Sequence, residues 1–178
     1  MIENGERRSK LSQIIAIDGP AGAGKTTLAK KIAGAISNKS VHVIHMDDLY
    51  DGWDNALTQS LTRTLESNIA KPVFEGKSYE YRKFSWLTMR FEELQRYSAP
   101  DVLLLEGVGS GQKVVRKYLD QLIWIDINAE VGLTRVLQRD GDYIESQMRI
   151  WQMRESEHFK QDNTRDCATI RIDGNNFI

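Results

Sequence analysis

Eight residues near the start of the chain have the spacing of a phosphate-binding loop. They read Gly19-Pro20-Ala21-Gly22-Ala23-Gly24-Lys25-Thr26 and fit the pattern G-x-x-x-x-G-K-[ST]. Glycine lets backbone N–H groups turn inward around a phosphate, because no Cβ stands in the way. Lys25 can bring a positive charge to the β- and γ-phosphates of a nucleotide, and the Thr26 hydroxyl can bind Mg²⁺. The residues predicted to hold the nucleotide are Gly19, Ala21, Gly22, Ala23, Gly24, Lys25, Thr26 and Thr27.

The segments on either side of this loop support that interpretation. Residues 14–18 form a short apolar run, which is typical of a buried strand. Within residues 27–36, Leu28, Ile32 and Ile36 fall on one face of a helix. Such a helix would direct its N-terminus and its dipole at the phosphates. The alternative is a glycine-rich turn that fits the pattern by chance, and the strand and helix on its two sides argue against it.

Acidic residues follow two further apolar segments. Asp47 and Asp48 come after residues 41–46, and Glu106 ends the apolar run of residues 101–106. The carboxyl ends of parallel strands meet at one edge of a sheet, so these carboxylates should face the bound phosphates. We expect Asp47 to accept the proton of an acceptor hydroxyl or to lie against the metal, and Glu106 to bind Mg²⁺ or its waters. The alternatives are turn capping by the aspartates and a solvated strand end at Glu106.

Two arginines are spaced to act together over the γ-phosphate. Arg135 and Arg139 are at positions i and i+4, so they share one face of the predicted helix. Asp140 and Gly141 then end that helix, and a closing lid can supply arginines from such a place. We therefore predict that Arg135 and Arg139 are catalytic, with ordinary surface arginines as the alternative. The following helix carries two weaker candidates, Arg149 and Arg154.

Aromatic residues surround the region where the phosphoryl acceptor would bind. They are Tyr50, Trp53, Tyr79, Tyr81, Phe84 and Trp86. Aromatic rings that carry a polar end suit a base, a sugar or another planar substrate, whereas the alternative is packing within the fold. The predicted substrate contacts are Asp48, Tyr50, Trp53, Tyr81 and Trp86.

Composition limits the classes of protein to which the chain can belong. With 178 residues, 40% of them hydrophobic and 28% charged, it suits one globular domain, which we place at 11–178 after a flexible tail at 1–10. The net charge of −1 gives no reason to expect a nucleic-acid partner. A single cysteine, Cys167, excludes a disulfide within the chain. The polar start and the short apolar runs predict a cytoplasmic protein without a membrane partner.

Short apolar segments alternate with helical patterns along the chain. We expect strands at about 12–18, 41–46, 101–107, 121–127 and 168–172, and helices from the loop to about residue 37 and at 54–70, 87–97, 112–119, 130–138 and 143–160. Asp54 is the predicted cap of the second helix, and residues 71–86 lack a period and could fold over a ligand. This alternation predicts an α/β fold, with a parallel sheet between two layers of helices.

Four segments together resemble the uridine kinase-like branch of the P-loop kinases, which is similar to phosphoribulokinase and pantothenate kinase. They are residues 18–27, Asp47-Asp48-Leu49-Tyr50, Leu105-Glu106-Gly107-Val108 and Arg135-Val136-Leu137-Gln138-Arg139-Asp140, and the likeness extends over about residues 12–174. The resemblance implies a three-layer fold with a five-stranded parallel sheet of order 2-3-1-4-5 and a short lid. It also implies ATP with Mg²⁺, transfer to a hydroxyl of a small molecule, Asp47 as the base, and Arg135 and Arg139 as lid arginines. Kinases of this branch often form oligomers, so the resemblance allows a homo-oligomer.

The sequence departs from uridine kinases where the pyrimidine would bind. Those enzymes resemble one another in a Tyr-Asp-Phe element with a downstream histidine, whereas this chain has Phe84-Ser85-Trp86 and then Met89. The departure leaves the acceptor open. The alternative function is an ATPase switch or regulator without a small-molecule acceptor. The Asn-Lys-x-Asp signature of GTPases does not occur, and the intact Lys25 and Thr26 argue against a binder without turnover.

Overall fold

The computed structural model describes residues 12–176, and the predicted tail at 1–10 lies outside this range. A five-stranded parallel sheet is formed by β1 (Gln13–Asp18), β2 (Val41–His45), β5 (Val102–Glu106), β6 (Gln121–Asp126) and β7 (Ile170–Asp173). Its order is β2-β5-β1-β6-β7, and every neighbouring pair is parallel. The labels differ from the predicted order because two strands of a separate hairpin intervene in the chain. Counted within the sheet alone, the order is 2-3-1-4-5.

Side chains on the two faces of the sheet belong to two separate hydrophobic clusters. In β1, Ile14 and Ala16 pack into the larger cluster, while Ile17 packs into the smaller one with Ala29 of α1 (Lys25–Ala35). This division follows from the alternation of side chains along a strand. The larger cluster includes Leu133 of α4 (Ala129–Asp140), and α5 (Glu145–Asp162) joins the same cluster. The predicted three-layer α/β fold is therefore confirmed.

One helical segment begins later than the sequence suggested. It runs without a break through α2 (Gln59–Arg63), the π-helical Thr64–Ala70 and α3 (Lys71–Phe74). The predicted cap at Asp54 is wrong, because Thr58 is the N-cap and Asp54 instead accepts a hydrogen bond from Arg154. The π-helical turns end at Ala70, two residues before Pro72, whose ring does not fit the preceding turn of a regular α-helix.

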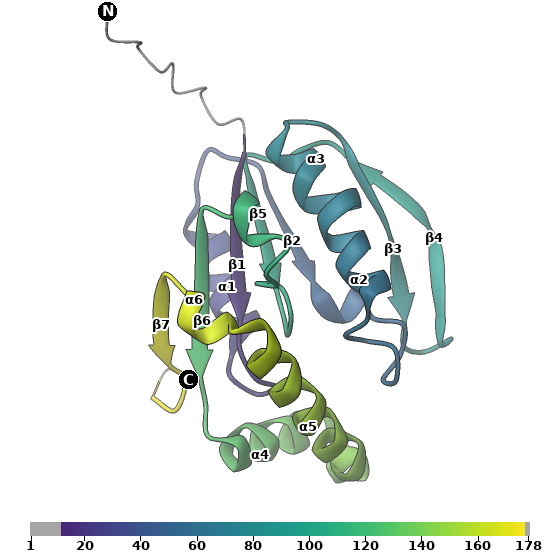
Figure 1. Cartoon of the computed structure of the whole chain (residues 1–178), viewed down its shortest axis with the longest axis vertical. Coiled ribbons are helices and arrows are strands. Elements are labelled where there is room, and N and C mark those ends of the chain that lie inside the picture. The colour runs from purple at the N-terminus through teal and green to yellow at the C-terminus, as the bar shows by residue number, and fades with distance from the viewer. Residues whose placement is uncertain (1–11, 177–178) are drawn as a thin grey trace, which may run out of the picture.

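The predicted helix at 87–97 is wrong, because this segment is a strand. β4 (Arg90–Tyr97) pairs antiparallel with β3 (Tyr79–Ser85), and Met89 makes the turn with φ 53°. Figure 1 shows this hairpin beside α2 and α3, on the side away from the parallel sheet. Nearly all of β4 is exposed, so its sequence lacks the apolar alternation that marks a half-buried strand.

The remaining elements differ from expectation mainly at their ends. Only a short 3₁₀ helix, Arg116–Tyr118, stands where a helix at 112–119 was predicted. Between α4 and α5 lies another 3₁₀ turn, Asp142–Ile144, and the small helix α6 (Thr164–Cys167) follows α5. Within the described residues, no helix has both the length and the apolar character needed to cross a bilayer.

Candidate active site

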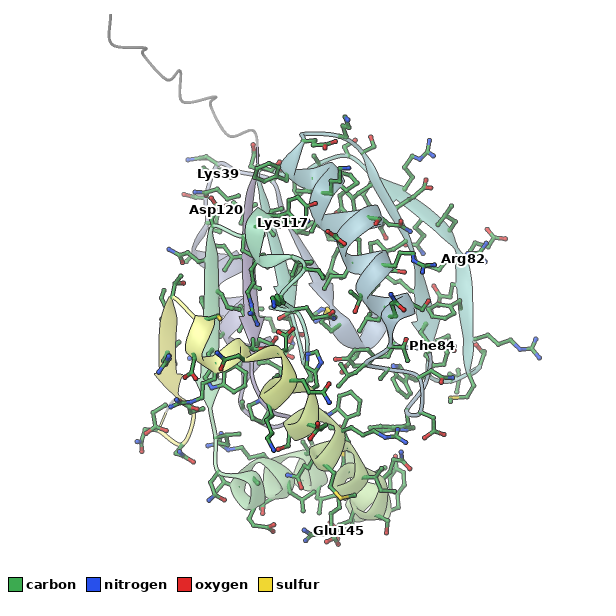
Figure 2. All side chains as sticks on the ribbon, viewed as in Figure 1. Lys39, Arg82, Phe84, Lys117, Asp120 and Glu145 are labelled. Carbon is green, nitrogen blue, oxygen red and sulfur yellow. The ribbon has the colours of Figure 1, made fainter. Side chains whose placement is uncertain are left out.

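One cavity of about 760 Å³ lies at the carboxyl ends of the sheet strands. It is lined by the phosphate loop, by acids that follow β2 and β5, by arginines of α4 and by aromatic side chains: Ala21, Gly22, Gly24, Lys25, Thr26, Thr27, Asp47, Tyr50, Trp53, Trp86, Glu106, Gly107, Val108, Arg135, Val136, Gln138, Arg139, Asp140, Met148 and Trp151. Lys39, Lys117 and Asp120 mark the opposite, amino end of the sheet in Figure 2. The cavity thus lies where ligands bind in open α/β sheets.

The phosphate loop has the backbone geometry that its glycines predict. Gly22 and Gly24 have φ angles of 76° and 95°, which glycine adopts without strain. A Cβ on Gly22 would lie 2.2 Å from the carbonyl oxygen of Gly132 in α4, so this position has room for glycine alone. The Lys25 Nζ donates hydrogen bonds of 2.7 Å to the carbonyls of Gly19 and Pro20. Strand, loop and helix follow one another as predicted, and the cradle fits a nucleotide phosphate.

Asp18 holds the start of the phosphate loop by hydrogen bonds, a role that the sequence did not predict. Its carboxylate is fully buried and accepts hydrogen bonds from the backbone N–H groups of Gly19, Gly109 and Gly111 at 2.8, 3.0 and 2.8 Å. Burial raises the pKa of Asp18, while the backbone donors and Lys25 act in the opposite direction. The side chain ties the phosphate loop to the turn after β5. A strand-end acid directly before the motif was the available signal.

Thr26 and Glu106 form the part of the site that fits a magnesium ion. The Thr26 hydroxyl donates a 2.9 Å hydrogen bond to Glu106 Oε1, which also contacts His45 Nδ1. Hydroxyl and carboxylate oxygens are ligands that Mg²⁺ takes together with phosphate oxygens and water. In residues 12–176, no group of three His, Cys, Asp or Glu side chains forms a metal cluster.

Asp47 faces the same cavity as Lys25. It lies in a 3₁₀ turn, Met46–Asp48, immediately after β2, and its main-chain carbonyl accepts a 3.0 Å hydrogen bond from Trp86 Nε1. Although the residue is open to the cavity, the surrounding protein displaces water and raises the pKa of its carboxyl. Glu106 raises this pKa further, while Lys25 and Arg139 lower it. A raised pKa makes the carboxylate a stronger base.

The arginines of α4 both reach the cavity, but they have different partners. Arg135 donates to the Gly174 carbonyl at 2.9 Å and to the Gly22 carbonyl at 3.5 Å, so it joins the phosphate loop to the turn after β7. Arg139 forms a two-point ion pair with Asp140 at 2.6 and 2.7 Å on the rim.

The two weaker arginine candidates do not line the cavity. Arg149 pairs with Glu145 and Glu130, and Arg154 binds Asp54 and the Trp53 carbonyl.

Four aromatic rings make one wall of the cavity. Tyr50 and Trp151 have ring centroids 5.4 Å apart, Trp53 lies 5.9 Å from Trp151, and Trp86 lies 5.3 Å from Trp53. Met148 completes this wall. The sequence analysis named Tyr50, Trp53 and Trp86 but missed Met148 and Trp151. Their spacing of i and i+3 on the predicted helix at 143–160 was the signal that could have placed them on one face.

Two of the predicted substrate residues lie elsewhere. Asp48 is absent from the cavity lining and forms an ion pair with Lys83 at 3.4 Å. Tyr81 is only 1% exposed and stacks on Tyr97, with the ring centroids 5.3 Å apart. Because side chains alternate along β3, Tyr81 points into the core between the hairpin and the helix of residues 59–74. The structure therefore gives neither residue a place against a ligand in this cavity.

The chain is similar in sequence to proteins described as uridine kinases. It is 27% identical over 142 residues to Uridine kinase-like protein 4 of Arabidopsis thaliana, an alignment that covers 71% of this chain but 30% of the plant protein. It is 28% identical over 149 residues to a uridine kinase of Clostridium botulinum strain Langeland, over 71% of this chain and 68% of that protein. No family model matches the chain.

Two solved structures with a similar fold are also described as kinases. A possible uridine kinase from Bacillus stearothermophilus superposes with a TM-score of 0.67 at 18% identity, over 93% of this chain and 91% of the other. D-glycerate 3-kinase from Cryptococcus neoformans gives a TM-score of 0.60 at 15% identity, over 95% and 86% of the two chains. These likenesses concern the fold, and they agree with the architecture predicted from the sequence.

Proposed function

We propose that this chain, a uridine kinase-like protein with the P-loop kinase fold, transfers the γ-phosphoryl group of ATP to a hydroxyl of a small molecule. One observation carries the proposal: Lys25 of the phosphate loop and Asp47 line one cavity together with four aromatic side chains. The cavity thus combines a phosphate cradle, a base and a surface for an acceptor. Similarity to proteins named uridine kinase supports the same activity.

In this proposal the residues of the chain divide the reaction between them. Backbone N–H groups of the phosphate loop and the Lys25 ammonium hold the β- and γ-phosphates. The acceptor oxygen attacks the γ-phosphorus, its proton passes to Asp47, and the bond to the β-phosphate oxygen breaks to release ADP. Arg139 on the rim stabilises the charge on the transferred group. Mg²⁺ at Thr26 and Glu106 would supply further positive charge to the phosphates when it is bound.

The aromatic wall suits an acceptor that has a flat ring. Trp53 and Trp86 line the cavity with their rings in an edge-on contact, and Gln138 adds an amide to the same lining. Of the residues at the place of the uridine kinase signature, Trp86 lines the cavity, Phe84 is 5% exposed and packed inside, and Met89 is 55% exposed. This arrangement favours a nucleoside or another planar alcohol without singling out uridine.

A transfer assay tests the proposal. Labelled ATP with Mg²⁺ is incubated with a panel of nucleosides, sugars and vitamins, and an acceptor-dependent product is expected for a planar alcohol. Hydrolysis of ATP at one rate with and without every acceptor would contradict the proposal and favour an ATPase switch. The Glu157→Gln variant is a suitable control, because Glu157 is exposed on α5 and absent from the cavity lining.

The proposal extends to the protein's location, partners and oligomeric state. We expect a cytoplasmic protein whose partner is its small-molecule substrate, without a nucleic-acid or membrane partner, and a homo-oligomer is compatible with this function. Size-exclusion chromatography with light scattering measures the oligomeric state directly.

A further inference from the structure

Glu155 is a buried carboxyl group that contacts the phosphate loop. It belongs to α5 and is 3% exposed, and its Oε2 accepts a 3.0 Å hydrogen bond from the backbone N–H of Ala21. Ala21 lines the nucleotide cavity, whereas Glu155 does not. The carboxylate therefore holds the loop from the side of α5, without occupying the space of the phosphates.

The groups that face Glu155 come from four other segments of the chain and from α5 itself. Lys25 of α1 and the indole N–H of Trp151 favour the ionised form, as does the Ala21 N–H group. Asp18 at the end of β1 disfavours it, and the buried Tyr50 hydroxyl also faces it. His158, on the next turn of α5, acts on Asp18. Burial outweighs the favourable groups and raises the pKa of Glu155 to about 7.

Lys25 is the positive charge shared by these buried acids. Its Nζ binds the Gly19 and Pro20 carbonyls at 2.7 Å, directly beside the Ala21 peptide that Glu155 contacts. A nucleoside triphosphate would bring several negative charges into the cavity and would attract the Lys25 ammonium. Glu155 would then face more negative charge and share its positive neighbour, and both changes disfavour the carboxylate.

We propose that Glu155 is a positioning residue of the phosphate loop, and that it takes up a proton from solvent when a nucleoside triphosphate binds. The protonated acid keeps an oxygen that accepts from Ala21, so the loop stays in place while the repulsive charge is removed. The inference rests on the nucleotide-binding part of the proposed function and does not require phosphoryl transfer.

The sign of the pH dependence follows from this coupling. If binding raises the pKa of Glu155, the complex holds more protons than the free protein at neutral pH, and nucleotide affinity decreases as the pH rises. An upward shift of one pKa unit corresponds to a roughly tenfold loss of affinity across the titration. Glutamine cannot titrate, and it retains an oxygen that accepts from the Ala21 N–H group.

Calorimetry measures directly how many protons the protein takes up when the nucleotide binds. A non-hydrolysable ATP analogue with Mg²⁺ is titrated into the protein at pH 7, in two buffers of different ionisation enthalpy. We expect the wild type to take up as much as roughly half a proton more than Glu155→Gln, since protons of the analogue contribute equally to both. From pH 6.5 to 8.5 the affinity of the wild type should decrease roughly tenfold more than that of Glu155→Gln. Glu157→Gln, two residues away, should behave as the wild type does.

A second variant tests the positioning role. Glu155→Ala removes the acceptor for the Ala21 N–H group, so it should bind the analogue more weakly than Glu155→Gln at every pH. Equal proton uptake by the wild type and Glu155→Gln, or equal affinities of the alanine and glutamine variants, would overturn the inference. Failure of the wild type to bind the analogue would overturn both the inference and the proposed function. Proton-coupled binding without transfer to any acceptor would overturn the kinase proposal alone.

Discussion

Thr26 and Glu106 are separated by 80 residues, yet the Thr26 hydroxyl donates a 2.9 Å hydrogen bond to Glu106 Oε1. β1 and β5 are neighbouring parallel strands, with Ile17 paired to Glu106, so the helix after β1 begins beside the end of β5. This register brings together two of the three residues, Thr26 and Glu106, that the sequence predicts at Mg²⁺ with Asp47.

Replacing Glu106 by glutamine should raise the Mg²⁺ concentration needed for transfer by about 10- to 100-fold, because the amide lacks the charge that attracts the ion. The activity of Glu106→Gln as a function of Mg²⁺ concentration tests this expectation. Glu157→Gln removes an exposed carboxylate from α5 and should leave the magnesium requirement unchanged. The same requirement in the wild type and Glu106→Gln would remove Glu106 from the metal site.

Asp47→Asn should lower the rate of transfer by roughly 10²- to 10⁴-fold while leaving ATP binding intact, because the amide cannot accept the proton of the acceptor. The base must be ionised, and burial raises its pKa. The rate of the wild type should therefore decrease as the pH falls through this raised pKa, and a pH–rate profile measures where it does. Transfer by Asp47→Asn at the wild-type rate would show that another group takes the proton.

The three central strands of the parallel sheet, β1, β5 and β6, were predictable because most of their residues are buried. β5 is buried at all of its positions, from Val102 to Glu106, and such a run is apolar throughout. β4 was not predictable, because it is held by pairing with β3 and is exposed along most of its length. Its residues carry no periodic pattern, and only the partner strand determines its structure.

The phosphate loop and the strand-end acids were predictable because they stand at fixed positions relative to their own strands. Trp151 and Glu155 belong to a helix that is far from the loop in sequence, and their role depends on where α5 crosses the sheet. Tyr81 was predicted to contact the substrate because a tyrosine suits a ligand. It lies instead on the face of β3 that is directed into the core. Three-dimensional packing, rather than residue type, decides such cases.

Glu155→Gln should be more stable than the wild type above pH 7 and lose this advantage in acid. The ordinary pKa is 4.5 and the folded one about 7, so the folded state binds more protons between these values. The contribution of Glu155 to stability is complete below about 4.5 and is lost as the pH rises through 7. The change is on the order of 2–3 kcal/mol. Melting temperatures of both proteins at pH 5 and pH 8 test it, and a difference that stays constant with pH would contradict it.

Replacement by alanine should be harmful at Gly22 of the phosphate loop and stabilising at Gly34 of α1. Gly22→Ala should abolish ATP binding, because φ is 76° and a Cβ would lie 2.2 Å from the Gly132 carbonyl oxygen. Gly34 lies in α1 with no atom within 4 Å of its Cβ position, so Gly34→Ala should stabilise the fold by roughly 0.5–1 kcal/mol. Thermal unfolding with and without ATP measures both effects, and an ATP-dependent shift in Gly22→Ala equal to that of the wild type would contradict the loop assignment.

Substitutions at Trp86 should separate its two contacts with the site. Its ring belongs to the aromatic wall of the cavity, and its Nε1 donates a 3.0 Å hydrogen bond to the Asp47 carbonyl. Trp86→Ala should raise the KM for the acceptor roughly tenfold and leave the KM for ATP unchanged, because a stacked ring contributes about 1 kcal/mol beyond its buried area. Trp86→Phe keeps a ring but loses the hydrogen bond to the Asp47 carbonyl. It should retain most of the affinity for the acceptor, and kcat should fall because Asp47 is no longer held in place.

Trp124→Phe is the control, since Trp124 packs on Phe159 outside the cavity lining. Equal increases in the KM for ATP and for the acceptor would show that Trp86 supports the whole site instead of contacting the acceptor alone.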